Sequence, residues 1–279
     1  MAYYNIAIYQ GPSGAEENEL ETSKFTALAF PDRATADLFY RFIQTYPRRE
    51  RGWNFTKLHR RSAQMWTYQG GHPADVARVV RFMWRPDFER GFPLYKGLSR
   101  SVMRHSYNGG LDDGDTVSIP PVVPFIHTLT DRLSGKWFYI CNRIRPEEFW
   151  GVVDGYVTPD VGVYQATKFR LDLANPQPGT LGTPLLVDDD MITITATVDG
   201  IETGICCNSP GGPLTSLAQF PSVMDYRFRF SSLRGFVSRS NVFATRLSQP
   251  LVHYFWSGEG EPLPSYWELR SAGPLARDI

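Results

Sequence analysis

Basic residues crowd into one stretch of the chain, between Arg41 and Arg104. This stretch holds fourteen Arg and Lys residues against four Asp and Glu residues, in a chain of 279 residues whose formal net charge is zero. Arg supplies 24 of the 29 basic residues of the whole chain. Because a guanidinium makes paired hydrogen bonds to carboxylate or phosphate groups and stacks on rings, this composition predicts a contact surface for an acidic partner.

Several of these arginines have a spacing that is typical of an exposed surface. Arg78, Arg81 and Arg85 lie three and four residues apart, so on a helix they would form one stripe. Aromatic residues of a kind that can stack on unpaired bases are interleaved in the same block. The candidate partner- or phosphate-binding residues are Arg48, Arg49, Arg51, Arg60, Arg61, Arg78, Arg81 and Arg85, and the candidate stacking or interface aromatics are Trp53, Trp66 and Tyr68.

Three interpretations of the basic block are open at the level of sequence. An acidic protein surface, including the acidic part of another copy of the chain, would meet the arginines through ion pairs. Single-stranded nucleic acid would meet them through phosphates and stacked bases. The third interpretation is an ordinary solvated helix face. Residues 105–226 carry a net charge of −9, which would repel a long polyanion and therefore favours a protein partner.

A short segment resembles a known catalytic loop. Residues 207–213 read Cys-Asn-Ser-Pro-Gly-Gly-Pro, and about six of them are similar to the loop around the nucleophilic serine of trypsin-like serine proteases. Pro210 directly follows Ser209, and Cys207 replaces the glycine before the motif, whereas the oxyanion hole of that family needs the N–H groups of this loop in a fixed geometry. The segment therefore predicts a tight surface turn, and a divergent hydrolase is only an alternative function.

Two acidic clusters, Asp112–Asp115 and Asp188–Asp190, could hold a hard cation through carboxylate oxygens. The first lacks the closing Glu of an EF-hand loop, and the second directly precedes a strand pattern, so neither predicts a metal site. The chain contains no phosphate-binding loop, dinucleotide-binding, nucleophile-elbow or zinc-protease motif. The sequence thus predicts a protein that is not an enzyme, with no catalytic residue, metal or cofactor.

Cys141, Cys206 and Cys207 are the only cysteines, an odd number without metal-binding spacing. The N-terminus shows no secretory signal, and no apolar run is long enough to span a bilayer. We therefore expect a soluble, intracellular protein (in a host cytoplasm or a virion) that does not contact membranes.

The pattern of apolar residues indicates an α+β protein. Residues 1–105 show strand and helix patterns in the order β-β-α-β-α, with one helix capped by Asp32 over about 34–45 and another over 73–84. Residues 106–279 are rich in strand patterns and end in a Pro-rich stretch from Glu261 onward, expected to pack as an extended arm. The clearest hairpin joins Met191–Val198 to Ile201–Cys207 through Asp199-Gly200, which is typical of a type I′ turn. We expect a small N-terminal α/β layer, residues 1–105, and a larger region of antiparallel hairpins, residues 106–279.

The segregated charge and the abundance of Arg and aromatic residues favour contacts over catalysis. The sequence therefore predicts a non-enzymatic structural or assembly protein, a component of a viral particle or a similar multi-copy shell. Its expected partners are other copies of itself or a shell or scaffold protein. An RNA- or single-stranded-nucleic-acid-binding protein that uses the block from Arg41 to Arg104 is the main alternative.

Overall fold

The chain folds into two compact units. The computed structural model describes residues 2–11, 25–49, 52–99, 101–107, 130–207, 214–216, 227–231, 237–238, 254–255 and 267–272. Unit 1 comprises Met1–Asp131 and Gln177–Leu185, and unit 2 comprises Arg132–Pro176 and Leu186–Ile279. The content of helix and strand is mixed, with a β-rich second unit, which confirms the expected α+β class. The described residues thus divide near residue 131, whereas the sequence suggested a division near residue 105.

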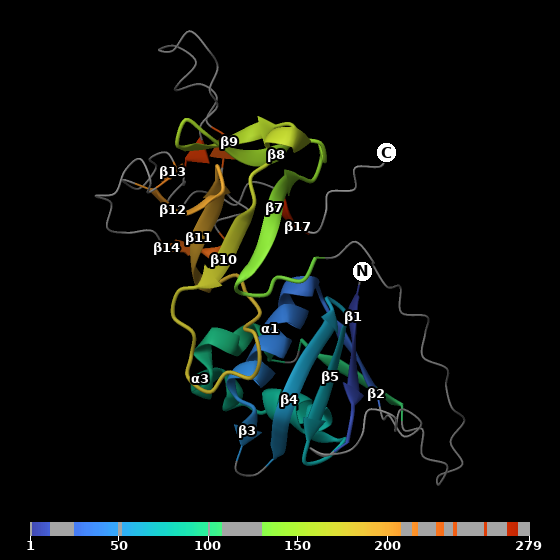
Figure 1. Ribbon diagram of the computed structural model, residues 1–279. Helices are drawn as coiled ribbons and strands as arrows, with labels where there is room; N and C mark the ends of the chain where they lie inside the picture. The colour runs from blue at the N-terminus through green and yellow to red at the C-terminus, as the bar shows by residue number, and fades with distance from the viewer. Residues whose placement is uncertain are drawn as a thin grey trace. The chain divides into compact units, whose positions relative to one another are not determined.

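Unit 1 is a six-stranded sheet with helices packed on it (Figure 1). The strands lie in the order β3-β4-β5-β1-β2-β6. Their bounds are β1 Tyr3–Tyr9, β2 Phe25–Phe30, β3 Arg48–Arg49, β4 Trp53–Ser62, β5 Met65–Gly70 and β6 Met103–Tyr107. The helices are α1 Arg33–Thr45, α2 Asp75–Met83, α3 Phe88–Gly91 and the 3-10 helix η2 Pro93–Leu98. β1 and β5 are parallel and the other neighbours antiparallel, an arrangement compatible with the predicted N-terminal layer.

α1 begins where the sequence places its cap. The side chain of Asp32 accepts a hydrogen bond from the backbone N–H of Thr35 at 2.8 Å. Phe39, Phe42 and Ile43 then fall on the buried face of the helix.

An aromatic cluster around Phe42 fixes the segment that follows α2. The ring centroids of Phe88, Phe92 and Tyr95 lie 5.6, 5.2 and 5.1 Å from that of Phe42, edge to face. Edge-to-face pairs of this kind contribute about 0.5–1.5 kcal/mol beyond the burial of their area. The cluster therefore holds α3 and η2 against α1 and leaves the outer side of this segment to solvent.

Unit 1 also includes a short segment from much later in the sequence, Gln177–Leu185. Gln44, at the end of α1, is buried, and its side-chain N–H group donates to the carbonyls of Leu181 and Thr183 at 3.0 and 2.8 Å. Its side-chain oxygen accepts from the backbone N–H of Leu185 at 3.0 Å. Residues 177–185 therefore belong to unit 1, although they connect two strands of unit 2.

Unit 2 contains a β-barrel, two further strands paired to it and a separate two-stranded sheet. Seven antiparallel strands lie in the order β10-β11-β12-β13-β9-β8-β7, and β7 pairs with β10 to close the barrel. The barrel strands are β7 Lys136–Asn142, β8 Phe149–Val153, β9 Tyr156–Val161, β10 Phe169–Leu173, β11 Met191–Val198, β12 Ile201–Cys207 and β13 Leu214–Ser216. β14 Arg227–Arg229 pairs with β11, β17 Trp267–Ser271 pairs with β7, and β15 Val237–Ser238 pairs with β16 Tyr254–Phe255. The 3-10 helix η3 Val163–Gln165 lies between β9 and β10.

Alternating apolar residues fill the barrel. Phe138, Trp150, Phe169, Ile194 and Ile205 are among the buried residues of its core, and each comes from a different strand. The hairpin of β11 and β12 coincides with the predicted one, and Asp199 and Gly200 have the positive φ angles, 50° and 79°, of a type I′ turn. β17 is the described part of the expected C-terminal arm.

Candidate interaction surface on the basic helix

The basic block is spread over several elements of unit 1. Eight of its described side chains are exposed, and they lie partly on the sheet and partly on the helical segment: Arg48, Lys57, Arg61, Arg78, Arg81, Arg85, Arg90 and Lys96. Arg41 and Arg60 are buried. Arg51 and Arg100 lie outside the described residues, as do the side chains of Arg49 and Arg104. The residues that sequence placed together are therefore dispersed over unit 1.

Trp53, Trp66 and Tyr68 are core residues, which corrects the prediction that they stack on a partner. The ring of Trp66 lies 5.5 Å from that of Tyr40 on α1, and the ring of Trp53 lies 5.2 Å from that of Phe82 on α2. The alternation of strands β4 and β5 turns these rings toward the helices. Exposed Lys57 and Arg61 also belong to β4, where the register shift between Phe55 and Lys57 reverses the alternation, so Lys57 is exposed although Trp53 and Phe55 are buried. The buried rings and the exposed cations of this stretch therefore do not share a surface.

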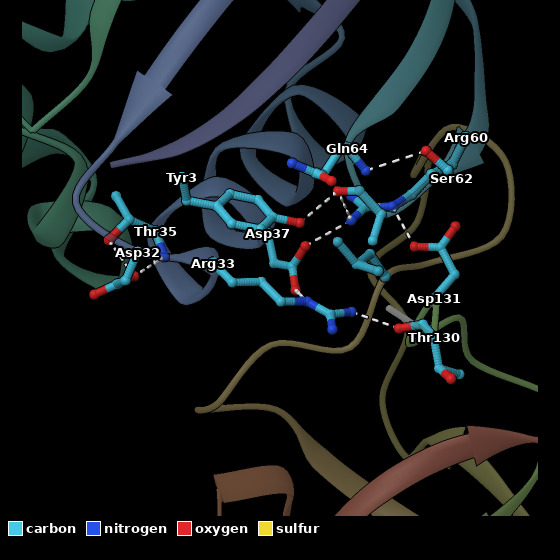
Figure 2. Close-up of polar contacts among 12 residues, drawn as sticks. Tyr3, Asp32, Arg33, Thr35, Asp37, Arg60, Ser62, Gln64, Thr130 and Asp131 are labelled. Atoms are coloured by element: carbon cyan, nitrogen blue, oxygen red, sulfur yellow. Dashed lines mark hydrogen bonds and ion pairs between the residues drawn. The ribbon is translucent and has the colours of Figure 1, made fainter. Parts of the chain in front are cut away.

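Arg60 is also withdrawn from the surface, because it forms a buried ion-pair cluster (Figure 2). Its Nη2 lies 2.6 Å from Oδ1 of Asp37, and its Nε lies 2.5 Å from Oδ1 of Asp131. Nη2 also donates to the carbonyl of Ala63 at 3.0 Å, and Arg33 Nε lies 3.3 Å from the second oxygen of Asp37. This corrects the assignment of Arg60 as a partner-binding residue.

The electrostatics of this cluster favour fixed protonation states. Burial acts to lower the pKa of Arg60, but the carboxylates of Asp37 and Asp131 outweigh burial and raise it. Burial raises the pKa of Tyr3 to about 12 and also raises the pKa of Tyr40, whose ring lies 4.9 Å from the guanidinium carbon of Arg60. The shifts thus keep the arginine charged and both phenols neutral near pH 7, which suits a structural role rather than proton transfer.

α2 separates an apolar face from a basic one. Its buried face carries Val76, Val79, Val80 and Met83, and Arg78 and Arg81 are exposed on the opposite face. The helix ends at Met83, one residue before its predicted end, so Arg85 lies in the turn beyond the helix. There its guanidinium carbon lies 5.8 Å from the ring centroid of Phe82. The predicted stripe of three arginines is therefore two helical arginines followed by one in a turn.

Asp75 anchors the start of α2. Its buried carboxylate accepts the backbone N–H groups of Asn54 and His72 at 3.2 and 3.1 Å. The other carboxylate oxygen lies 2.8 Å from Nη1 of Arg78. Arg78 is thus partly engaged within the helix, whereas Arg81 and Arg85 form no ion pair with any residue that the structure describes.

Trp84 is the surface residue that sequence reasoning missed. Its side chain is 51% exposed at the C-terminal cap of α2, next to Arg85 and one turn from Arg81. Leu94, in the following segment, is 64% exposed. Pro86 was the available signal, because a proline stops the helix and leaves Trp84 at its end rather than on its buried stripe. We call Arg78, Arg81, Trp84 and Arg85 the arginine patch.

Of the other candidate sites, one falls within the described residues and two do not. Ser209 and Asp112–Asp115 lie outside the described residues. At Asp188–Asp190, Oδ2 of Asp190 accepts the backbone N–H of Val187 at 2.9 Å, as in a local turn. No group of three or more His, Cys, Asp or Glu residues in the described ranges could hold a metal ion, and none of the described helices is both long and apolar enough to cross a membrane.

No protein-family model matches this chain, and no curated protein matches it. Among solved structures, the chain is similar to the botulinum neurotoxin serotype D/C VPI 5993 binding domain, with 11% sequence identity and a TM-score of 0.34. The similar region covers 54% of this chain and 47% of that one, so this chain spans about half the length of that structure.

Proposed function

We propose that this protein is a non-enzymatic assembly protein that binds an acidic protein surface through the arginine patch. The observation that carries the proposal is Trp84, which is half exposed at the C-terminal end of α2, between Arg81 on the helix and Arg85 in the turn beyond it. The other face of α2 is fixed in the core. Trp and Arg are the residue types most enriched among the few side chains that dominate protein interfaces. The patch combines both types on a rigid support, which lowers the entropy lost on binding.

The placement of the other candidates favours a protein partner over RNA. A single-stranded nucleic acid needs aromatic rings along a continuous basic groove. Trp53 and Trp66 are in the core, Arg60 is ion-paired internally, and Arg61 extends from a different part of unit 1. The arginine patch offers three cations and one ring, which matches a patch of carboxylates better than a long strand, and the other exposed cations of the block, such as Arg48, Lys57 and Arg90, lie on other elements.

Another copy of the chain is the acidic partner that its own composition suggests. Residues 105–226 carry a net charge of −9, so every copy brings both a basic patch and a stretch of chain with an excess of acidic residues. A contact between unlike surfaces of identical chains repeats from copy to copy and generates rings, shells or filaments. That such a shell is a viral particle is the finer prediction from the sequence, and it stays a prediction.

Charge reversal tests this proposal. Arg81→Glu combined with Arg85→Glu should weaken self-association by about thirtyfold or more, the loss expected for two central interface residues. The matched control is Lys57→Glu with Arg61→Glu, which makes the same change in net charge at exposed positions of β4 and should leave association unchanged. Sedimentation velocity of the full chain at low salt measures the self-association of both variants. For the wild-type chain, about 1 M salt should dissociate the contact by screening its charges.

A titration with single-stranded RNA distinguishes the proposed protein partner from the alternative, in which the chain binds nucleic acid. The proposal predicts negligible binding of RNA by the wild-type chain. If RNA instead binds with steep salt dependence, and the patch variant lowers its affinity for all sequences alike, nucleic acid is the partner and the proposal is wrong. A wild-type chain that stays monomeric at low salt would also contradict it.

A further inference from the structure

The outer edge of β4, the side away from β5, is only partly paired. β4 runs from Trp53 to Ser62, but β3 pairs with it only at Trp53 and Asn54. No other strand that the structure describes pairs with this side of β4. Such an edge presents backbone N–H and C=O groups that can pair with a strand of another chain, so stable proteins cover or blunt it.

Hydrogen bonds in the sheet show which groups of β4 face this edge. The backbone carbonyl of Tyr68 on β5 accepts the N–H of Gln10, just beyond β1, at 2.9 Å, so the backbone groups of Tyr68 face β1. Backbone groups of successive residues point to alternate sides of a strand, so those of Thr67 face β4, where His59 is its partner. Leu58, next to His59, therefore directs its backbone groups to the outer edge.

A segment from much later in the chain lies against this edge at Leu58. Residues 177–185, which connect β10 to β11, belong to unit 1 (Figure 1). A Cβ atom built at Gly182 would lie 3.4 Å from the backbone oxygen of Leu58, so the backbone of the segment passes close to that outward carbonyl. Gly182 has a φ angle of 65°, in the left-handed region that favours glycine, and the segment bends there. We call residues 177–185 the edge cover.

Gln44, at the end of α1, holds the edge cover in place. Its backbone carbonyl accepts the N–H of Leu181 at 3.0 Å. Its side-chain N–H group donates to the carbonyls of Leu181 and Thr183, and its side-chain oxygen accepts the N–H of Leu185. One buried side chain thus ties three positions of the edge cover to a helix of unit 1.

The edge cover buries few apolar groups of its own. Leu185, at its end, is the one buried residue of the cover, and five others are exposed: Gln177, Pro178, Gly179, Gly182 and Thr183. Segments with few buried apolar contacts open locally at a lower free energy than the whole domain unfolds. The hydrogen bonds of Gln44 are therefore the main restraint on the cover.

Charged side chains give the same strand a second protection. Lys57, His59 and Arg61 of β4 are exposed. A second β4 that lay along the outer edge would bring the same basic groups against them, and like charges disfavour such a pair. This protection weakens in salt, because salt screens the repulsion.

From these contacts we infer that the edge cover is an autoinhibitory contact, which occupies the outer edge of β4 and prevents a second copy of the chain from pairing there. Gln44 keeps the cover closed, and its opening exposes the backbone groups of Leu58. This device is independent of the arginine patch and has the opposite dependence on salt. Salt weakens the attraction at the patch, whereas at the β4 edge it weakens a repulsion.

Hydrogen exchange of the full chain tests the restraint. Gln44→Ala removes the three side-chain hydrogen bonds, so exchange should become about tenfold faster or more at residues 57–60 and 178–184, while the other strands of unit 1 keep their wild-type rates. Gln64→Ala is the matched control, because Gln64 is another buried glutamine of unit 1 and its side chain donates to the carbonyl of Tyr4 on β1. It should not speed exchange selectively at the edge cover.

Sedimentation velocity at about 1 M salt tests the guarding role, since the arginine patch is then screened. The wild-type chain and Gln64→Ala should stay monomeric, whereas Gln44→Ala should self-associate as the protein concentration rises. Gly182→Ala is a second variant that leaves α1 intact. It places a side chain at a φ angle of 65°, which strains the cover, and it should show both effects even if Gln44→Ala does not fold.

Three outcomes would overturn the inference. Wild-type exchange rates at the β4 edge in both opened variants would show that Gln44 and Gly182 do not hold a cover. Faster exchange throughout unit 1, equal to that of Gln64→Ala, would show general destabilisation instead. Faster exchange at the edge without self-association at high salt would show that the cover guards nothing. Arg81→Glu with Arg85→Glu should leave all these readouts unchanged, so the inference and the proposed function fail or succeed separately.

Discussion

The buried guanidinium of Arg60 is held by two carboxylates from different parts of unit 1. Asp37 comes from α1, and Asp131 is the last residue of the first part of the unit. Removal of a charge from water is unfavourable by several kcal/mol, and two charged partners with short hydrogen bonds offset that cost. The cluster therefore specifies how α1, β4 and residue 131 come together. It does so even if apolar side chains of the same size, put in place of the charged ones, would give a fold of equal stability.

Loss of one carboxylate should reveal this dependence. Asp37→Ala leaves Arg60 buried with only part of its charge compensated, so we expect the free energy of unfolding to fall by about 3–5 kcal/mol. Glu202→Ala is the control, because it breaks the exposed ion pair with Arg170 and should cost about 0–1 kcal/mol. Urea denaturation followed by fluorescence measures both. Equal, small losses in the two variants would contradict the role given to the cluster.

Buried tyrosines predict a loss of stability in alkali. The pKa of Tyr3 is raised to about 12 by burial, and burial also raises the pKa values of Tyr40 and Tyr68. The ordinary value in an unfolded chain is about 10. Below that pH the phenols are neutral in both states. Between about 10 and 12 only the unfolded state loses its protons, so stability falls as the pH rises.

Tyr3→Phe should make this alkaline decline shallower. The variant also loses the hydrogen bond from the Tyr3 hydroxyl to the carbonyl of Ala63, and that loss shifts the stability by a constant amount below the titration. Urea midpoints measured from neutral pH to about pH 12 separate the constant offset from the slope. A slope identical to that of the wild-type chain would contradict the prediction.

At the level of elements, the close approach of β4 and β5 depends on Gly70. A Cβ atom built at Gly70 would lie 2.3 Å from the backbone oxygen of Asn54, a contact that side-chain atoms do not make. Asp75, which anchors α2, lies on the same side, 3.2 Å from that position. The glycine thus allows the strand pair and the start of α2 to pack together.

Gly70→Ala should therefore destabilise unit 1 by about 1–3 kcal/mol, the usual result of forcing an extra carbon into a packed site. Gly91→Ala is the control, since nothing lies within 4 Å of a Cβ atom there and the change should stay within about 0.5 kcal/mol. Thermal unfolding measured by circular dichroism compares the two variants. The prediction is wrong if their transition temperatures fall equally.

Local patterns predicted individual elements better than surfaces. The Asp32 cap and the Asp199-Gly200 turn are set by hydrogen bonds and φ angles within a few residues, so their sequence neighbourhood is enough to find them. Trp66 and Arg60 depend instead on what lies across the sheet. Trp66 is buried because it packs on α1, and Arg60 is buried because it pairs with Asp37 and Asp131. These partners lie far away in the sequence, so no local pattern indicates them.

The same limit explains the candidate sites. Arg81 was found because a helix brings nearby residues to one side, whereas the strands of the barrel come together only through their order in the sheet. Such an order is set by long-range pairing, as in the closure of β7 on β10, and the sequence pattern of single strands does not contain it.

For the whole molecule, the proposed contact through the arginine patch would join unlike surfaces of neighbouring copies through charges. Because a contact of this kind weakens as salt rises, ionic strength would set how far the proposed assembly proceeds.

The segment that Gln44 binds has a consequence for the synthesis of the chain. Residues up to 131 leave the ribosome first, but Leu181, Thr183 and Leu185 are made at least fifty residues later. At usual translation speeds this delay is roughly 3 to 11 seconds. During that time the end of α1 is uncovered in the nascent N-terminal unit, and the amide of Gln44 hydrogen-bonds to water in place of Leu181, Thr183 and Leu185. Biogenesis of the first unit is therefore completed only after much of the barrel sequence has emerged.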